Sequence, residues 1–168
     1  LRSLYLLFAS YYFYACWNPR YTLLIALSTI ITYISGLLIE KSNKKVKKKF
    51  IMALSLISNL LILAIFKYAN FAIETLNAIF SHWGISIIDK RVDLLLPVGI
   101  SFYTFQALSY TLDIYNERIE VERNLIRYAL FVSFFPQLVA GPIERSGNLL
   151  RQVQSIKEKN LWDFERLR

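Results

Sequence analysis

The sequence predicts an all-α fold, a polytopic bundle of transmembrane helices with interfacial and re-entrant segments. Two observations predict it. Of the 168 residues, 55% are hydrophobic and 15% are aromatic, which is more than an average soluble domain carries. Charged residues also divide the chain into five apolar stretches of about 16 to 19 residues, each without Asp, Glu, Lys or Arg. The whole chain, 1–168, is therefore expected to form a single partial membrane domain.

The first two apolar stretches, residues 3–19 and 21–39, are each expected to cross the membrane as a helix. A signal peptide does not explain the first stretch, because no small-residue cleavage site follows it and the second stretch comes at once. Cys16, in the first stretch, is the only cysteine. The chain can therefore form no disulfide within itself and no cysteine-based metal site.

A basic connector, residues 41–49, separates the second and third apolar stretches. Its six lysines are Lys41, Lys44, Lys45, Lys47, Lys48 and Lys49. Because positive connectors stay on the cytoplasmic side, this one is predicted to be cytoplasmic and to lie against anionic membrane lipid. The net charge of +8 is thus interpreted as an orientation signal. Binding to nucleic acid is not expected, because no aromatic residues are interleaved with the basic ones.

A third span is predicted over residues 50–68, with residues 69–93 at the outer face. Apolar and polar residues alternate there at helical spacing, which predicts an amphipathic interfacial helix closed by Gly84. His82, the only histidine, falls in this region. A lone loop histidine is more often an ordinary surface residue than a base or a metal ligand, and no metal site is predicted.

The fourth predicted span covers residues 94–115. Pro97 suits the first turn of such a helix, where its missing N–H leaves no hydrogen bond unmade, and Gly99 and Ser101 would allow a neighbouring helix to approach closely. A helix over the whole range would be about 33 Å long, enough to cross a hydrocarbon core of about 30 Å.

Polar residues form a stripe along this fourth span. Gln106, Tyr110 and Asp113 follow at i, i+4 and i+7, so a helix places them on one side. Polar and ionisable groups are costly in lipid, so this stripe is expected to face protein or a water-filled cavity. With Ser101, these residues are the candidate lining of a polar tunnel. The alternative is that Asp113 is a solvated residue at the helix end and that the tyrosines are interfacial anchors.

The last apolar stretch, residues 128–143, contains the helix breakers Pro136, Gly141 and Pro142. Broken helices occur at membrane depth only where the freed backbone groups are buried in protein or line a cavity. These three residues are therefore predicted to shape a structural turn near a site, and whether the stretch spans or re-enters is left open. Residues 116–127 are expected to form a cytoplasmic connector, and residues 146–168 an amphipathic tail on the cytoplasmic surface.

Three motifs together resemble a known family. They are FKYANF (66–71), PVGISFYTFQALSYTLDIY (97–115) and FVSFFPQLVAGPIER (131–145). They are similar to the membrane-bound O-acyltransferase (MBOAT) family, in particular its branch of alginate O-acetyltransferases, and the resemblance covers nearly the whole chain. Since the chain begins without Met and ends soon after these motifs, it is expected to be an N-terminal or central fragment of a longer protein.

The resemblance implies a multi-pass enzyme of the cytoplasmic membrane that passes an acyl group to an acceptor hydroxyl. The acceptor would be an exported polysaccharide, the donor an acetyl group on a thioester carrier, and partner proteins would handle acetyl groups outside the membrane. No permanently bound cofactor is implied. The family's hallmark histidine is expected beyond Arg168, and His82 does not match its motif, so the fragment alone is expected to be inactive.

Two other functions stay open at this point. One is the transfer of another acyl group, such as D-alanine to teichoic acid, onto a different envelope polymer. The other is a non-enzymatic membrane subunit whose polar stripe transports or docks a partner. A catalytic histidine beyond Arg168 would separate the enzymes from the subunit. Acyl transfer to a hydroxyl needs a base near the attacking oxygen and donors for the developing oxyanion.

Overall fold

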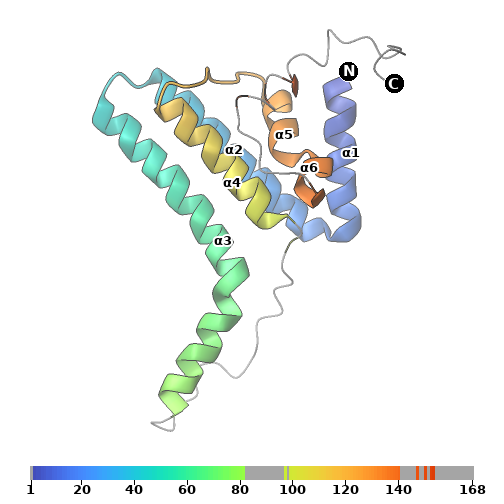
Figure 1. Cartoon of the computed structure of the whole chain (residues 1–168), viewed down its shortest axis with the longest axis vertical. Helices are drawn as coiled ribbons and strands as arrows, with labels where there is room; N and C mark the ends of the chain where they lie inside the picture. Colours follow the sequence, from blue (N-terminus) through green and yellow to red (C-terminus); the bar gives the residue numbers. More distant parts are fainter. Residues whose placement is uncertain are drawn as a thin grey trace.

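The computed structural model describes residues 2–81, 97, 99–140, 147, 150 and 152–153, and helices dominate this part of the chain (Figure 1). The helices are α1 (Arg2–Trp17), α2 (Pro19–Lys41), α3 (Lys45–Ser81), α4 (Ile100–Tyr115), α5 (Leu125–Ser133) and α6 (Phe135–Ala140). No strand occurs among the described residues. The prediction of an all-helical fold is confirmed.

A tight corner joins α1 to α2. The Asn18 side chain accepts a hydrogen bond from the Arg20 N–H at 3.0 Å, and Pro19 occupies the first position of α2, where its missing N–H costs nothing. At the other end, the backbone N–H of Ser42 bonds to the Ile39 carbonyl. The first two predicted helices therefore exist, with boundaries shifted by about two residues because Asn18 acts as the cap.

Helix α3 corrects one prediction. Its 37 residues, about 55 Å at 1.5 Å per residue, run without interruption from Lys45 to Ser81. The predicted division into a span over 50–68 and a separate interfacial helix after residue 68 is wrong, because no proline or glycine in that stretch stops the helix. The second half of α3 extends beyond the other helices (Figure 1). Gly84 and His82 lie outside the described residues.

Helix α4 corrects a second prediction. It begins at Ile100 rather than at residue 94 and is 16 residues long, about 24 Å. Gly99 precedes it with a positive φ of 74°, a left-handed conformation that glycine adopts without strain and that does not continue a right-handed helix. Pro97 therefore lies before the helix and not in its first turn, and its carbonyl accepts a hydrogen bond from the Ile100 N–H.

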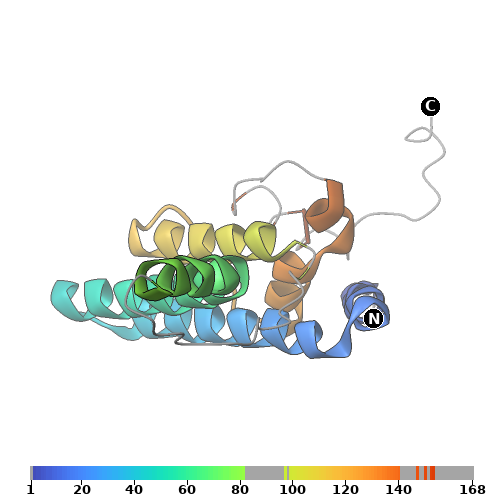
Figure 2. The same ribbon diagram turned by 90° about the horizontal axis from the view of Figure 1, so that it is seen from below.

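The helices alternate in direction, and α2 packs against α1, α3, α4 and α5 (Figures 1 and 2). The alternation places the α2–α3 and α4–α5 connectors at the same end of the bundle. Two ion pairs tie the α4–α5 connector to the neighbouring helix ends, from Glu117 to Lys48 in the first turn of α3 and from Arg123 to Glu40 in the last turn of α2. Residues 116–127 therefore lie at the same end of the bundle as the basic connector, and the cytoplasmic location of this end stays a prediction.

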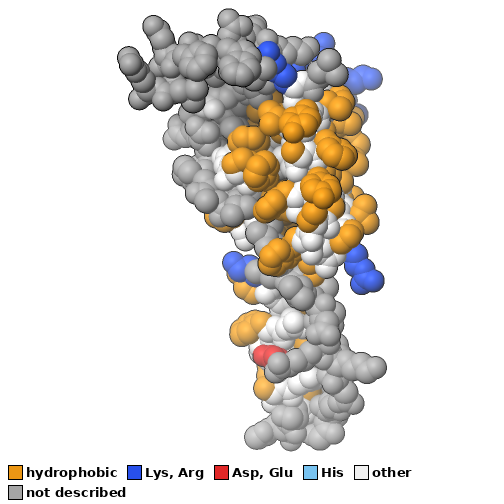
Figure 3. All heavy atoms as spheres, turned by 90° about the vertical axis from the view of Figure 1, so that its right-hand side faces the viewer, with side chains coloured by type: hydrophobic (Ala, Val, Ile, Leu, Met, Phe, Trp, Pro, Cys, Tyr) orange, Lys and Arg blue, Asp and Glu red, His pale blue; other side chains and the backbone are white. Residues whose placement is uncertain are grey.

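Polar side chains lie inside the bundle together with a hydrophobic core, and many other large apolar side chains face outward. Ser28 is 1% exposed and Asn59 1%, whereas Leu23 is 71% and Phe50 68% exposed. The Ser28 hydroxyl donates to the Asn59 side-chain oxygen, which joins α2 to α3. Figure 3 shows one outer face covered by hydrophobic side chains, with Lys and Arg gathered toward its ends. This distribution is typical of helices whose solvent is lipid.

Two described helices, α2 and α3, are long and apolar enough to cross a membrane by length and composition. Helix α1 and helix α4, with 16 residues each, are shorter than the roughly 20 residues of a typical span. Of the predicted tail, Leu150 and Val153 are buried, and Leu150 belongs to the main hydrophobic core. The rest of the tail is largely outside the described residues.

Candidate functional site

A polar groove lies where the C-terminal ends of α2 and α4 meet the start of α3 and the α4–α5 connector. Its volume is about 780 Å³. Apolar side chains from α2, α4 and the connector form part of the wall, and charged side chains form the rest. The lining residues are Ile39, Glu40, Lys48, Ile114, Glu117, Arg118, Ile119, Glu120, Val121, Glu122, Arg123 and Arg127.

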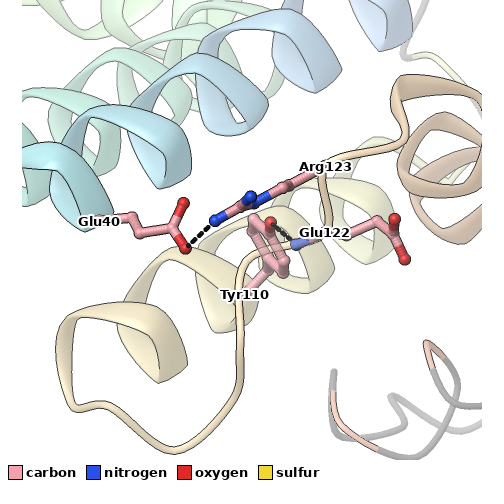
Figure 4. A network of polar contacts seen from close by, with 4 residues as sticks. All are labelled: Glu40, Tyr110, Glu122 and Arg123. Atoms are coloured by element: carbon pink, nitrogen blue, oxygen red, sulfur yellow. Dashed lines mark hydrogen bonds and ion pairs between the residues drawn. The ribbon is translucent and has the colours of Figure 1, made fainter.

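Two tyrosines hold the connector that walls this groove. Tyr110, fully buried on α4, accepts a hydrogen bond at its hydroxyl from the Glu122 backbone N–H at 3.1 Å (Figure 4). Tyr33 on α2 donates its hydroxyl hydrogen to the Arg123 carbonyl at 2.6 Å. Both contacts are to the backbone, so the two tyrosines hold the path of the connector from outside it.

The same connector caps the N-terminus of α5. The buried Glu122 carboxylate accepts from the Asn124 N–H at 2.9 Å, and the Asn124 side chain in turn accepts from the Ile126 and Arg127 N–H groups. An asparagine at this position satisfies helix N–H groups that have no partner within the helix. The groove wall and the first turn of α5 are thus one hydrogen-bonded unit.

Ion pairs lie around the groove. Arg123 contacts Glu40 at 3.2 Å, Lys48 contacts Glu117 at 3.1 Å, and Arg118 contacts Asp113 at 3.7 Å (the first is drawn in Figure 4). In each pair at least one side chain is more than 70% exposed. Exposed pairs contribute about 0 to 1 kcal/mol to stability and leave the charges accessible. The groove therefore offers both signs of charge to a ligand.

Gln106 lies on α4 one turn before Tyr110, and its side chain makes a hydrogen bond to the backbone of α5 close to the helix break. Its Nε2 donates to the Phe131 carbonyl at 2.7 Å, and the residue is 3% exposed. Helix α5 ends at Ser133, so this carbonyl belongs to the last turn, where carbonyls have no partner within the helix. The Gln106 amide thus supplies a donor that the broken backbone cannot.

The break itself was predicted. Phe134 is extended, with ψ of 100°, and separates α5 from α6. Pro136 is the second residue of α6, where its missing N–H is tolerated, whereas a continuous helix would place its ring against the carbonyl of residue 132. The helix therefore breaks at Phe134, two residues before Pro136, and its first half begins earlier than expected, at Leu125; the role of Pro136 in a turn near a site stays a prediction. Gly141 and Pro142 lie outside the described residues.

A cluster of aromatic rings lies between the groove and the break. The Tyr128 ring is 4.4 Å from the Tyr110 ring and 5.9 Å from the Phe131 ring, measured between centroids. Its hydroxyl donates to Thr32 Oγ1 at 2.6 Å, which joins α5 to α2. The Thr32 hydroxyl in turn donates a hydrogen bond to the Ser28 carbonyl at 2.8 Å. The centre of the bundle is therefore a hydrogen-bonded polar network within apolar helices.

Only part of the predicted polar stripe on α4 lies on one buried face. Gln106 and Tyr110 are both buried, and α5 packs against both. Asp113 is partly exposed near the groove and pairs with Arg118, which agrees with its reading as a boundary residue at the helix end. Ser101 is half-buried. Both Gln106 and Tyr110 are fully packed in the described structure, so their tunnel-lining role stays a prediction.

Sequence reasoning missed Tyr33, Thr32 and Tyr128, which complete the polar network. Each is a polar residue inside a stretch otherwise suitable for a membrane span, and this was the available signal. Their partners lie about 90 residues apart in sequence, which periodicity within one helix does not reveal. The part of the chain that the structure describes contains no group of three or more His, Cys, Asp or Glu residues placed to hold a metal ion.

The chain is similar to bacterial O-acetyltransferases. It is 40% identical over 152 residues to the probable alginate O-acetylase of Pseudomonas aeruginosa, a match that covers 90% of this chain and 29% of that protein. The probable alginate O-acetylase of Azotobacter vinelandii gives 40% identity over 90% of this chain and 30% of its own length. The peptidoglycan O-acetyltransferase of Helicobacter pylori is 34% identical over 94% of this chain and 33% of that protein.

The chain therefore spans about 30% of the length of the curated relatives it matches. No family model matches the chain. No solved structure matches it either.

Proposed function

Since the chain is homologous to O-acetyltransferases of the MBOAT family, we propose that it forms one part of a membrane enzyme that O-acetylates an exported or cell-surface polysaccharide. The observation that carries this proposal is the match of nine-tenths of the chain, at 40% identity, to probable alginate O-acetylases. An alginate-like polymer is the first candidate acceptor.

The proposed reaction is acyl transfer to a hydroxyl. The acceptor oxygen attacks the carbonyl carbon of an acetyl thioester while a base takes the hydroxyl proton. The C–S bond then breaks, and the protonated base returns the proton to the leaving sulfur, which departs as the thiol of the carrier. The base would be a histidine in the part of the enzyme that this chain does not include. The chain itself would supply the wall and the support of the site.

The groove supports a role on the donor side. It lies at the end of the bundle that carries the basic connector, residues 41–49, which the positive-inside rule assigns to the cytoplasm. Donor and acceptor that approach from opposite faces of the membrane need a polar route between them. In this proposal the groove is the cytoplasmic mouth, and the network of Gln106, Tyr110 and Tyr128 holds the helices behind it. Partner proteins would take up the acetyl group on the outer side.

Peptidoglycan is the second candidate acceptor. The match to the Helicobacter pylori peptidoglycan O-acetyltransferase covers slightly more of this chain, 94%, at lower identity, 34%. Transfer of D-alanine to another envelope polymer and a non-catalytic membrane subunit remain as alternatives, and no comparison reported above favours either of them.

Acetyl-ester analysis tests the proposal. The full-length protein would be expressed in an alginate-producing bacterium that lacks its own O-acetylase, and acetyl esters would be measured on secreted alginate and on peptidoglycan. Restored esters on alginate are the expected result. Esters on peptidoglycan alone would move the assignment to the second acceptor. A protein that inserts into the membrane but changes neither polymer would overturn the enzymatic proposal.

A further inference from the structure

A second hollow opens beside the basic connector, and it shares only Lys48 and Glu117 with the lining of the groove described above. Its volume is about 550 Å³, and its lining is Asn43, Lys45, Lys48, Tyr115, Asn116 and Glu117. Five of these six side chains carry hydrogen-bond donors, and two are cationic. The hollow therefore presents donors and positive charge at the end of the helices, where a membrane surface would lie.

The charge balance of the hollow favours an anion. Its one carboxylate, Glu117, is paired with Lys48 at 3.1 Å. Lys45 is exposed and makes no ion pair within the described residues. Further lysines flank it in the connector, at positions 44, 47 and 49. A phosphate group placed here would meet a free ammonium group, a second one shared with Glu117, and two neutral amide side chains.

An apolar stripe on α4 leads away from the hollow. Leu112, Phe105 and Phe102 are 38%, 46% and 38% exposed, and their spacing places them on the same side of α4 as Asn116, which lines the hollow. A free phosphate would make no use of this stripe. A phospholipid would, because its acyl chains run into the hydrocarbon while its phosphate stays at the interface.

We propose that the hollow of Asn43, Lys45, Lys48, Tyr115, Asn116 and Glu117 binds the phosphate of an anionic phospholipid, with an acyl chain along the Phe102–Phe105–Leu112 stripe. The charge complementarity of the hollow and the apolar stripe beside it carry the proposal together. It is independent of which polymer the enzyme acetylates. The bound lipid would fix the α2–α3 connector against the membrane next to the groove.

Lipid titration of the delipidated full-length protein in detergent tests the site, with native mass spectrometry to count bound phosphatidylglycerol and phosphatidylcholine. The variant Lys45→Gln/Lys48→Gln should bind phosphatidylglycerol roughly 30-fold more weakly, since each lysine near an anionic surface contributes about 1 kcal/mol. The matched control is Lys47→Gln/Lys49→Gln, which removes the same charge from the same connector and leaves the hollow intact. It should change the affinity less than about threefold, because its charges are partly screened.

A variant that should bind the lipid more tightly makes the test independent of folding defects, because a misfolded variant would only bind more weakly. Glu117→Gln removes the carboxylate and frees Lys48, so phosphatidylglycerol should bind more tightly, whereas Glu120→Gln removes an equal charge outside the hollow and should have a smaller effect. Equal losses in the two lysine variants, or no gain in Glu117→Gln, would overturn the site and leave only diffuse attraction to the membrane.

Competition identifies the source of the phosphate. Inorganic phosphate should displace phosphatidylglycerol poorly, and Leu112→Gln should weaken binding of the lipid. If inorganic phosphate competes as well as the lipid and Leu112→Gln has no effect, the hollow is a site for soluble phosphate and the lipid proposal is wrong.

Discussion

The interior of the bundle and its groove end use similar polar groups in opposite ways. Inside, Gln106 and Tyr128 are almost completely buried, and each makes one short hydrogen bond to another helix. At the groove end, Glu40, Arg123 and Lys48 form ion pairs that stay partly in contact with solvent. Losing a buried partner leaves an unsatisfied group, whereas losing an exposed one returns its partner to water.

The difference shows where the sequence specifies the fold and where it leaves room for a ligand. The buried hydrogen bonds hold a broken helix and a backbone connector in one arrangement. The exposed charges add little stability and remain able to exchange partners. We therefore expect changes in the interior to affect folding first, and changes in the groove to affect function first.

The largest effect on stability is expected from Gln106→Leu. The substitution removes the donor to the Phe131 carbonyl at the helix break and should cost about 1 to 3 kcal/mol of unfolding free energy. Ser101→Ala, half-buried on the same helix, is the matched control and should change little. Unfolding of the full-length protein in detergent would measure both. Equal stability of the two variants would show that the Gln106 hydrogen bond to the Phe131 carbonyl does not stabilise the helix break.

A smaller effect is expected from Tyr128→Phe. The ring contacts remain and only the hydrogen bond to Thr32 is lost, so the cost should lie near 0.6 kcal/mol and below about 1.7 kcal/mol, as for other hydrogen bonds between membrane helices. Thr32→Val completes a double-mutant cycle, and Tyr5→Phe, on the exposed face of α1, is the control. A coupling energy of zero would show that the bond contributes nothing to the contact between α2 and α5.

The smallest effect on stability is expected from Glu40→Gln and Arg123→Gln at the groove. Their coupling energy should be below about 1 kcal/mol and should fall further in high salt, because both side chains contact solvent. A salt-independent coupling above that value would contradict the picture of an exposed, exchangeable pair.

Asp113 sharpens the same comparison, because it lies on the predicted stripe but near the groove. Asp113→Ala removes its pair with the exposed Arg118 and should leave both stability and acetyl transfer close to wild type. Acetyl-ester analysis beside Gln106→Leu would separate the two residues. A strong loss of activity in Asp113→Ala alone would restore the tunnel-lining role that the sequence suggested.

The elements that follow from local rules were predictable. The first two helices and the helix break beside Pro136 each depend on residues close in sequence, and the structure has them, whereas the predicted connector 41–49 is shorter than expected because α3 already begins at Lys45. Two boundaries were not. A change from lipid-facing to amphipathic composition near residue 68 suggested the end of a helix, but composition does not break backbone hydrogen bonds, so α3 continues to Ser81. The left-handed Gly99 delayed the start of α4.

Only the α4 side of the candidate site was predicted from the sequence. Helical spacing correctly gave Gln106 and Tyr110 a common buried face, but it could not supply the Phe131 carbonyl, the Glu122 N–H or the groove beside them. Those partners come from the α4–α5 connector and α5, and their positions depend on tertiary packing. Asp113 was assigned to the same face although its place at the end of α4 brings it within reach of Arg118.

Filling the groove tests the central claim most directly. Glu120→Trp would place a large side chain in the groove, while Leu125→Trp would place the same side chain at an exposed position that does not line it. In the full-length enzyme, Glu120→Trp is expected to lower polysaccharide O-acetylation by on the order of tenfold or more, because misplaced reactants lose rate steeply, with an unchanged melting temperature. Leu125→Trp should acetylate as the wild type does. Wild-type acetylation in Glu120→Trp would contradict the assignment of the groove to the reaction.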